Sequence, residues 1–159
     1  ILLIGQRKNE LGGSAYYALF DELGKNIPKP NLAGVEAEIW AITDVIDASL
    51  VHATHDISDG GVAVALAEMS FENEIGFEIE IEQDMRTDQW LFSQTGGFIL
   101  EADNINVPAI ISIMSGYGIP VTELSRTTAH QVMVFGNVIH VPLARVKESW
   151  RGGLRDKLK

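Results

Sequence analysis

Cysteine is absent from the 159 residues of this chain. The absence excludes disulfides and thiolate metal sites, and it fits a reducing compartment, so we expect a cytoplasmic protein. No apolar run approaches the length of a membrane span. The apolar start at residues 1–4 is too short for a signal peptide and has no basic flank. The sequence therefore predicts no association with a membrane.

Basic residues are scarce in the first half of the chain. The formal net charge is −10, which argues against a nucleic-acid polymer as partner. Residues 30–84 contain no Lys or Arg but 13 Asp and Glu, whereas residues 145–159 contain six basic and two acidic residues. An anion bound within the acidic stretch would need backbone N–H groups, Mg²⁺, or basic residues from another domain.

The composition and the order of the patterns indicate one α/β domain. Hydrophobic residues make up 46% of the chain, and 15 residues are glycine, which suits this class. Alternating strand and helix patterns predict an α/β fold with a mixed sheet packed with helices. We expect the domain over residues 1–150 and a loose basic tail over residues 151–159. The chain begins on a strand-like residue without Met, so we expect a fragment of a longer protein.

A glycine turn joins a predicted strand to a predicted buried helix near the middle of the chain. The strand covers residues 51–57, and the helix covers residues 61–71 with Glu68 as its single charged residue. Such a turn commonly presents backbone N–H groups to an anion. His55 shares the apolar face of the strand, where a hydrogen-bonded structural histidine is the default. The full motif reads His55-Asp56-Ile57-Ser58-Asp59-Gly60-Gly61.

Five residues of this motif are candidates for binding a nucleotide or phosphate. Asp56 ends the strand on the face opposite the apolar one, where it could hold the turn or meet a ligand or Mg²⁺. Ser58 and Asp59 could cap the following helix or contact the ligand directly. Gly60 and Gly61 are costly in a first helical turn, so either close packing or a close ligand must require them.

A second glycine pair, Gly12-Gly13, follows the strand predicted at residues 1–4. Ser14 then precedes a helix predicted over residues 15–23, which Gly24 can close. Gly12, Gly13 and Ser14 complete the candidate binding set. For this pair taken alone, a tight turn with close packing is the competing interpretation.

The remaining elements follow from periodicity and turn residues. They are helices over residues 31–49, 88–92, 107–117 and 142–150, strands over 77–82, 98–102 and 119–124, and a hairpin over 131–141 about Gly136-Asn137. No nucleophile elbow, Walker A loop, dinucleotide fingerprint or zinc motif appears. Two backbone anion cradles in an acidic domain favour a phosphate or nucleotide ligand.

Residues 55–69 closely resemble a motif in the second C-terminal-type domain of the phosphoribosylformylglycinamidine synthase family. Leu11-Gly12-Gly13-Ser14 is similar to that family's opening of this domain. Residues 91–94 resemble its Leu-Phe-Ser-Glu signature, with Gln94 in place of the acid, and Gly97-Phe98 stands where the family often has Gly-Arg. The resemblance covers residues 1–150 and implies the C-terminal domain fold of the aminoimidazole ribonucleotide synthetase type.

The resemblance implies ATP-dependent amidation of formylglycinamide ribonucleotide in de novo purine biosynthesis. ATP would phosphorylate the amide oxygen, ammonia would displace the phosphate, and Mg²⁺ would neutralise the phosphate charges. The implied partners are N-terminal domains of the same chain, a glutaminase subunit, a small bridging subunit and a phosphorylated ribonucleotide substrate. The fragment would supply part of a nucleotide or phosphate site, contain no catalytic residue and be inactive alone.

Two alternatives remain. One is a non-catalytic scaffold or interaction domain of that enzyme, and the other is a domain of a sibling ATP-dependent synthetase or kinase.

Overall fold

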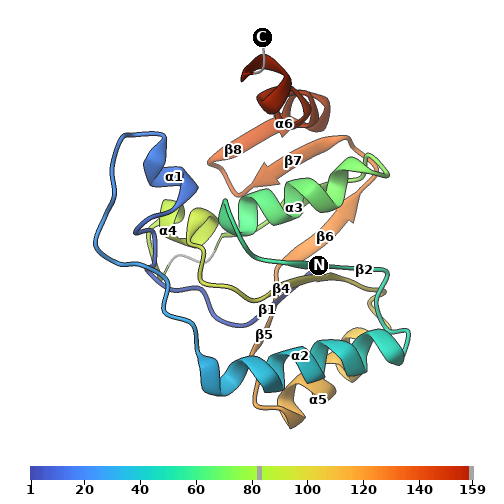
Figure 1. Cartoon of the computed structure of the whole chain (residues 1–159). Helices are drawn as coiled ribbons and strands as arrows, with labels where there is room; N and C mark the ends of the chain where they lie inside the picture. The colour runs from blue at the N-terminus through green and yellow to red at the C-terminus, as the bar shows by residue number, and fades with distance from the viewer. Residues whose placement is uncertain (82–83, 158–159) are drawn as a thin grey trace.

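The chain folds into two four-stranded sheets with helices between and around them (Figure 1). The computed structural model describes residues 1–81 and 84–157, with side chains up to residue 153. The strands are β1 (Leu2–Ile4), β2 (Ala53–Asp56), β3 (Gly76–Ile79), β4 (Phe98–Glu101), β5 (Val121–Glu123), β6 (Ser125–Thr128), β7 (Val132–Phe135) and β8 (Ile139–Pro142). The helices are α1 (Ala15–Ala18), α2 (Leu32–Asp47), α3 (Gly61–Phe71), α4 (Thr87–Phe92), α5 (Val107–Gly116) and α6 (Leu143–Lys157).

The two sheets differ in their strand directions. The first has the order β2-β4-β1-β5 and is antiparallel throughout. The second has the order β6-β3-β7-β8 and is mixed, because β3 and β7 run parallel. The predicted α/β class with a mixed sheet is confirmed, and a second, antiparallel sheet accompanies the mixed one. β6, which pairs with β3, has no counterpart among the predicted strands.

Helix α3 is buried between the two sheets. Figure 1 shows it in green across the middle of the molecule, with α2 and α5 on the opposite face of the first sheet. The apolar residues of α3 form one cluster with Leu3 and Ile99 of the first sheet and with Phe77 and Phe135 of the second. A helix in this position needs apolar side chains on nearly every side. The predicted burial of this helix on both sides is confirmed.

Helix α1 is shorter than the predicted helix over residues 15–23. It ends at Ala18, because Asp21 adopts a positive φ of 57° and reverses the chain. The reversal carries the carbonyl of Leu23 to the N–H of Gly13 at 2.7 Å. The apolar side chains after the helix stay exposed, so no packed face sustains further turns.

Helix α2 follows its predicted bounds, but only part of its apolar face is buried. Ala41, Ile42 and Val45 are buried against the first sheet. Val35 and Ile39, which share the helical spacing of the core residues, are 44% and 53% exposed. The N-terminal half of α2 therefore extends beyond the sheet that its C-terminal half covers.

Two further differences concern strand and helix ends. β3 stops at Ile79 instead of continuing as a regular alternating strand, and Glu82, the predicted end, lies outside the described residues. α6 continues through Lys157, so Arg151 is followed by more helix and not by the predicted loose end. Its Trp150 packs on Phe71 of α3 with ring centroids 5.2 Å apart, which gives the helix a buried partner beyond its first turns.

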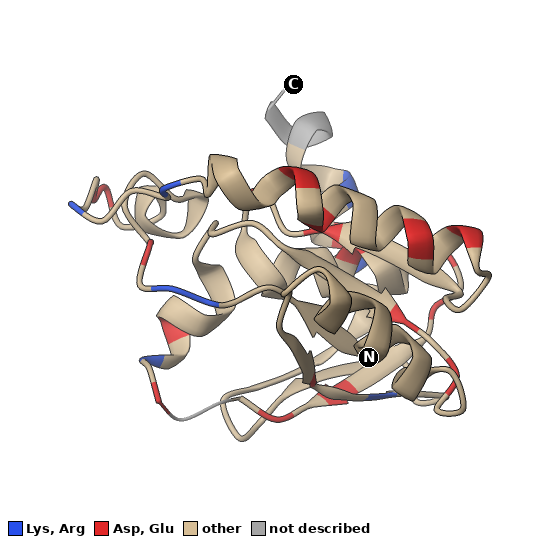
Figure 2. Cartoon of the chain, turned by 90° about the horizontal axis from the view of Figure 1, so that it is seen from below, with Lys and Arg blue, Asp and Glu red and all other residues tan. Residues whose placement is uncertain are grey.

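Charge is unevenly distributed over the molecule. Figure 2 shows Asp and Glu recurring along the helices, and Lys and Arg at a few positions, several of them in loops. In the described parts of the chain, 1–81 and 84–157, no helix combines the length and apolarity that crossing a bilayer requires.

Candidate functional site

The strand register brings four chain segments together at one end of the first sheet. Ile4 at the end of β1 pairs with Phe98 at the start of β4, and Asp56 at the end of β2 pairs with the same residue. Ile4 also pairs with Val121 at the start of β5. The loops that leave β1 and β2 and those that enter β4 and β5 therefore meet at this end, where side chains can converge on one ligand.

A cleft of about 590 Å³ opens at this end of the sheet, beside the first turns of α2. We call it the α2 cleft. Its charged side chains are Lys8, Lys29, Glu38 and Asp56. The two lysines precede the long stretch without Lys or Arg, and folding carries them to the cleft that Asp56 lines. A ligand in the α2 cleft would thus meet basic side chains of this chain as well as carboxylates.

Glu38 is the half-buried carboxyl of the cleft. Its Oε1 lies 3.2 Å from the position that a Cβ on Gly5 would occupy, so the glycine leaves room for it. Burial raises the pKa of Glu38 above its ordinary value, because the charged form loses hydration. Asp56, by contrast, is exposed at the end of β2.

Arg7 supports one wall of the cleft. Its guanidinium is buried and donates to the carbonyl of Gly96 at 3.0 Å and to the carbonyl of Ser93. Burial lowers the pKa of Arg7 to about 10, and nearby Glu10 opposes the shift. The arginine holds the backbone of residues 93–97, whose glycines line the cleft. No sequence pattern pointed to it, since an arginine in a polar loop is most often solvated.

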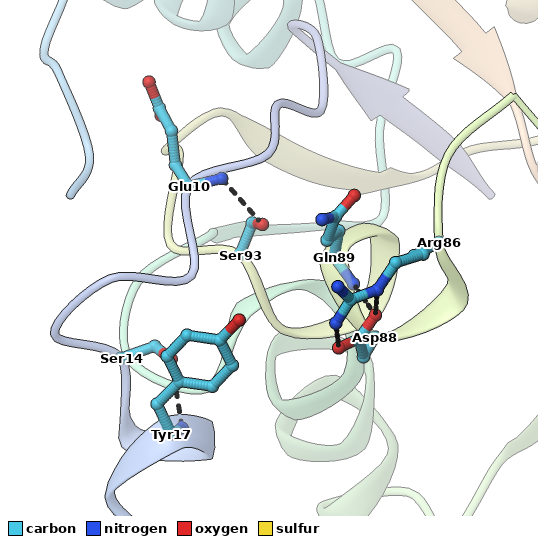
Figure 3. A network of polar contacts seen from close by, with 7 residues as sticks. All are labelled: Glu10, Ser14, Tyr17, Arg86, Asp88, Gln89 and Ser93. Carbon is cyan, nitrogen blue, oxygen red and sulfur yellow. Dashed lines mark hydrogen bonds and ion pairs between the residues drawn. The ribbon is translucent and has the colours of Figure 1, made fainter. Parts of the chain in front are cut away.

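The loop that carries Gly12 and Gly13 is hydrogen-bonded to the end of α4, as Figure 3 shows. The N–H of Glu10 donates to the hydroxyl of Ser93 at 3.3 Å. Ser14 is buried, and its hydroxyl accepts from the N–H of Tyr17 at 3.2 Å, so it caps α1. Asp88 accepts from the N–H that follows it at the start of α4. Ser14 thus has a structural partner within the chain.

The N–H groups of the first glycine pair also donate within the chain. Gly12 donates to the carbonyl of Asn26 at 2.8 Å, Gly13 to that of Leu23 at 2.7 Å, and Ser14 to the carbonyl three residues before it. A Cβ on Gly12 would lie 2.7 Å from the backbone of Asn26. Close packing therefore accounts for the first glycine of the pair, and a positive φ of 71° accounts for the second.

The second glycine pair begins α3 in an unusual backbone conformation. Gly60 has φ +83° and Gly61 has φ +68°, the left-handed region that favours glycine. A Cβ on Gly61 would lie 2.6 Å from the carbonyl oxygen of Leu91 and 2.8 Å from the backbone of Phe92. Of the two explanations that the sequence leaves open, the structure supplies close packing against the end of α4.

Ser58 and Asp59 are exposed and do not cap α3. The N-cap residue is Gly60, and no side chain bonds to the cap position. The carbonyl of Ser58 accepts from the N–H of Gly61 at 3.0 Å, which closes the turn through the backbone. Of the two roles that the sequence leaves open for these side chains, the structure does not show helix capping. Both residues lie at the surface, two and three positions after Asp56.

Gln94 joins the two glycine turns. With its amide oxygen facing the turns, it accepts from the N–H of Gly60 and from the N–H of Ala15, each at 3.1 Å. This orientation is assigned from the hydrogen bonds that it satisfies. The two strand–glycine–helix units, which are distant in sequence, thus share one acceptor.

His55 connects β2 with two helices. Its Nε2 lies 3.4 Å from Oε2 of Glu68 on α3, and Oε1 of the same carboxylate accepts from the indole N–H of Trp150 at 2.9 Å. Its Nδ1 lies 2.7 Å from the carbonyl oxygen of Asp56. These contacts confirm a hydrogen-bonded structural role for this histidine. The chain of contacts also links α6 to the residue that lines the cleft.

Asp56 has no cluster of metal ligands around it. Across the described side chains, those of residues 1–81 and 84–153, no group of three His, Asp or Glu is arranged to hold a metal ion. A single carboxylate can still contribute to Mg²⁺ binding, because Mg²⁺ is commonly held by one or two carboxylates together with water and substrate phosphates. Any Mg²⁺ at Asp56 would therefore depend on a bound phosphate or on other parts of the protein.

Residues 1–136 match the family described as AIR synthase related protein, C-terminal domain. The chain belongs to this family. A curated relative, the phosphoribosylformylglycinamidine synthase subunit PurL of Methanothrix thermoacetophila, is 30% identical over 165 residues, which cover all of this chain and 22% of the relative. The chain thus spans about a fifth of that relative's length.

Solved structures support the fold of this family member. T. maritima PurL complexed with FGAR superposes with a TM-score of 0.75 at 18% identity, over 92% of this chain and 27% of that one. T. maritima PurL complexed with ATP gives a TM-score of 0.69 at 16% identity, over 92% of this chain and 25% of that one. At 16–18% identity, these two comparisons establish a shared fold and nothing beyond it.

Proposed function

We propose that this chain is a C-terminal domain of a phosphoribosylformylglycinamidine synthase and supplies one wall of its site for a phosphorylated ligand. The observation that carries the proposal is the position of Asp56, which ends β2 in the motif and lines a cleft together with lysines of the same chain. The family membership and the PurL relatives support it. The substrates would be formylglycinamide ribonucleotide and ATP, since T. maritima PurL forms complexes with FGAR and with ATP.

The residues of this chain would bind and position, while the reacting groups come from elsewhere in the enzyme. Lys8 and Lys29 would offset phosphate charge, and Asp56 is the residue of this chain that would hold Mg²⁺. Ser58 and Asp59 contact the ligand from the exposed turn. The packed glycines Gly12, Gly13, Gly60 and Gly61, with Ser14, keep this wall in place. Mg²⁺ would supply neutralisation of the phosphate charge.

In the whole enzyme, ATP would phosphorylate the amide oxygen of formylglycinamide ribonucleotide, and ammonia would displace that phosphate. N-terminal domains of the chain would complete the site. A glutaminase subunit would release the ammonia, and a small bridging subunit would join it to the synthetase subunit that contains this chain. The relative's name, which calls PurL a subunit, supports a multi-subunit enzyme. The 159-residue chain alone would have no activity, and the assembled enzyme would act in the cytoplasm.

The test is turnover by the full-length protein that contains this chain. ATP hydrolysis should require formylglycinamide ribonucleotide and ammonia together, and Asp56→Asn should lower it about tenfold or more. Asp47→Asn, which removes the same charge at the far end of α2, is the matched control and should leave turnover unchanged. ATP use that depends on a different acceptor would instead indicate a sibling synthetase or kinase.

A scaffold role is the second candidate, and one observation favours it. The N–H groups of both glycine pairs donate to acceptors within the chain, so the turns are already filled. A pure scaffold predicts that Asp56→Asn and Asp47→Asn have equal turnover in the full-length enzyme. It also predicts that Gly60→Val together with Gly61→Val lowers the melting temperature without changing ligand affinity.

A further inference from the structure

A row of large apolar side chains along α2 is exposed to solvent. Leu32, Val35, Ile39 and Ile46 have exposed fractions between 44% and 79%, and we call these four residues the α2 stripe. Successive members are three, four and seven residues apart, so all four lie on one side of the helix. Figure 1 shows α2 on the outside of the first sheet, where α5 packs beside it. An exposed row of this kind marks an interaction surface.

The spacing of the α2 stripe suits a partner helix. Together with Ile42, which is buried on the same helix, the stripe has the alternating three- and four-residue spacing of a coiled-coil seam. The side chains of such a seam pack between those of one neighbouring helix. The stripe extends over residues 32–46, which is about 21 Å of helix. A partner helix of about four turns would therefore cover it.

The charge around the α2 stripe determines which partner fits it. Every charged residue of α2 is acidic, and residues 30–84 contain no Lys or Arg. The exposed Glu36 lies four residues after Leu32 and three before Ile39, so it borders the stripe. A second copy of α2 would bring acidic residues against acidic residues, which opposes pairing. Acidic residues likewise disfavour an anionic lipid surface. A helix with Lys and Arg beside its apolar seam supplies the opposite charge.

We propose that the α2 stripe binds a helix of another subunit, which is apolar along one face and carries Lys and Arg beside that face. The choice of another subunit rests on the proposed function, which includes separate subunits. The surface and its chemistry rest on the exposure and charge of α2. Val35 and Ile39 also line the α2 cleft, so the bound helix would lie next to the wall that the proposed function assigns to the ligand.

The experiment is a titration of the ¹⁵N-labelled 159-residue chain with three synthetic peptides, each of about three heptads. The basic peptide has leucine at the seam positions with Lys and Arg beside them, and the acidic peptide has the same leucines with Glu beside them. The scrambled peptide has the composition of the basic one in an order without a seam. Because the chain has a net charge of −10, the scrambled peptide measures attraction by charge alone. The basic peptide should shift the amides of residues 32–46 and bind at least tenfold more tightly than either of the others.

Two double variants test the apolar part of the surface. Leu32→Ser with Ile39→Ser should weaken binding of the basic peptide about tenfold or more, because two apolar contacts are lost. Ile105→Ser with Val138→Ser is the matched control, since it removes two exposed apolar side chains outside α2. The control should change the affinity less than twofold.

A charge reversal tests the acidic part of the surface. Glu36→Lys should weaken binding of the basic peptide and strengthen binding of the acidic peptide, because the charge beside the stripe changes sign. Glu72→Lys makes the same change at an exposed position after α3. This control should leave the ratio of the two affinities unchanged.

The proposal is overturned if the basic and scrambled peptides bind equally, or if the shifted amides lie outside α2. It is also overturned if another occupant is found. Dimerisation of the chain that Leu32→Ser with Ile39→Ser abolishes would identify a second copy, and binding to phosphatidylserine vesicles with the same dependence would identify a membrane. The full-length protein without other subunits should bind the basic peptide as the 159-residue chain does. Loss of binding there would mean that the rest of the polypeptide covers the stripe.

The outcome is separable from that of the proposed function, because peptide binding is measured without substrates. Selective binding at the α2 stripe without formylglycinamidine ribonucleotide synthesis by the full-length protein keeps the surface and rejects the reaction. Synthesis by the full-length protein together with equal binding of the three peptides keeps the reaction and rejects the surface.

Discussion

Replacing Gly61 by alanine tests whether packing, rather than a ligand, requires the glycine at the start of α3. The new Cβ would lie 2.6 Å from the carbonyl oxygen of Leu91 and 2.8 Å from the backbone of Phe92. Such an overlap in a packed interior costs about 1–3 kcal/mol. The positive φ of 68° adds about 1–2 kcal/mol for any residue with a Cβ. We expect Gly61→Ala to lower the free energy of unfolding by about 2–5 kcal/mol.

Gly13→Ala is the matched control for this variant. Its φ is 71°, and nothing lies within 4 Å of the added Cβ, so it should show the conformational cost alone, about 1–2 kcal/mol. Urea unfolding at neutral pH measures both variants, and the difference between them isolates the overlap. Equal unfolding free energies for Gly61→Ala and Gly13→Ala would refute the packing explanation. A bound ligand would then be the remaining explanation for the glycine at position 61. In a chain of this size each kcal/mol corresponds to about 2–4 °C in melting temperature.

Three further perturbations test the groups around the cleft. Arg7→Met should lower the free energy of urea unfolding by about 2–4 kcal/mol, because the carbonyls of Ser93 and Gly96 lose a charged donor. Equal stability of this variant and the exposed control Lys8→Met would contradict the role of Arg7 in holding residues 93–97. Gln94→Ala should lower the free energy of unfolding by about 1–2 kcal/mol and speed hydrogen exchange at the Gly60 amide. Unchanged exchange at this amide would contradict the hydrogen bond from Gly60 to Gln94. Burial raises the pKa of Glu38, so the folded state favours the protonated carboxyl. The contribution of Glu38 to the free energy of unfolding is therefore fully present below the unfolded pKa of about 4.3, and it is lost as the pH rises through the pKa in the folded state. Glu38→Gln should therefore gain stability over the unchanged chain between about pH 4 and pH 7 in urea unfolding, and a pH-independent difference would contradict this.

Much of the fold follows from local patterns in the sequence. The helix after Gly60, the hairpin about Gly136 and the strand near Val121 were all predictable and are confirmed. In each case, periodicity and a turn residue agree on one answer. β6 was not predictable, because Ser125–Thr128 has no apolar face and exists through its pairing with β3. The early end of α1 likewise depends on a tertiary hydrogen bond.

The site was predictable only where it lies within one motif. Asp56 was identified from the strand and turn that carry it, and the structure places it in a cleft. Lys8 and Lys29 join that cleft through the register of the first sheet and the course of the chain into α2, which no local pattern encodes. Arg7 was missed for the same reason. The glycine pairs stood out in the sequence, but the backbone segments that pack against Gly12 and Gly61 became visible only in three dimensions.

The contacts of Trp150 with Glu68 and Phe71 extend the packed unit beyond the residues that the family model matches. The family match ends at residue 136, yet β8 forms an edge of the second sheet and α6 covers α3 beyond that point. A chain cut at residue 136 would expose Phe71 and leave β7 as an open edge prone to pairing with other chains. A chain of this protein that keeps β8 and α6 should therefore be more stable and less prone to aggregation than one cut at residue 136.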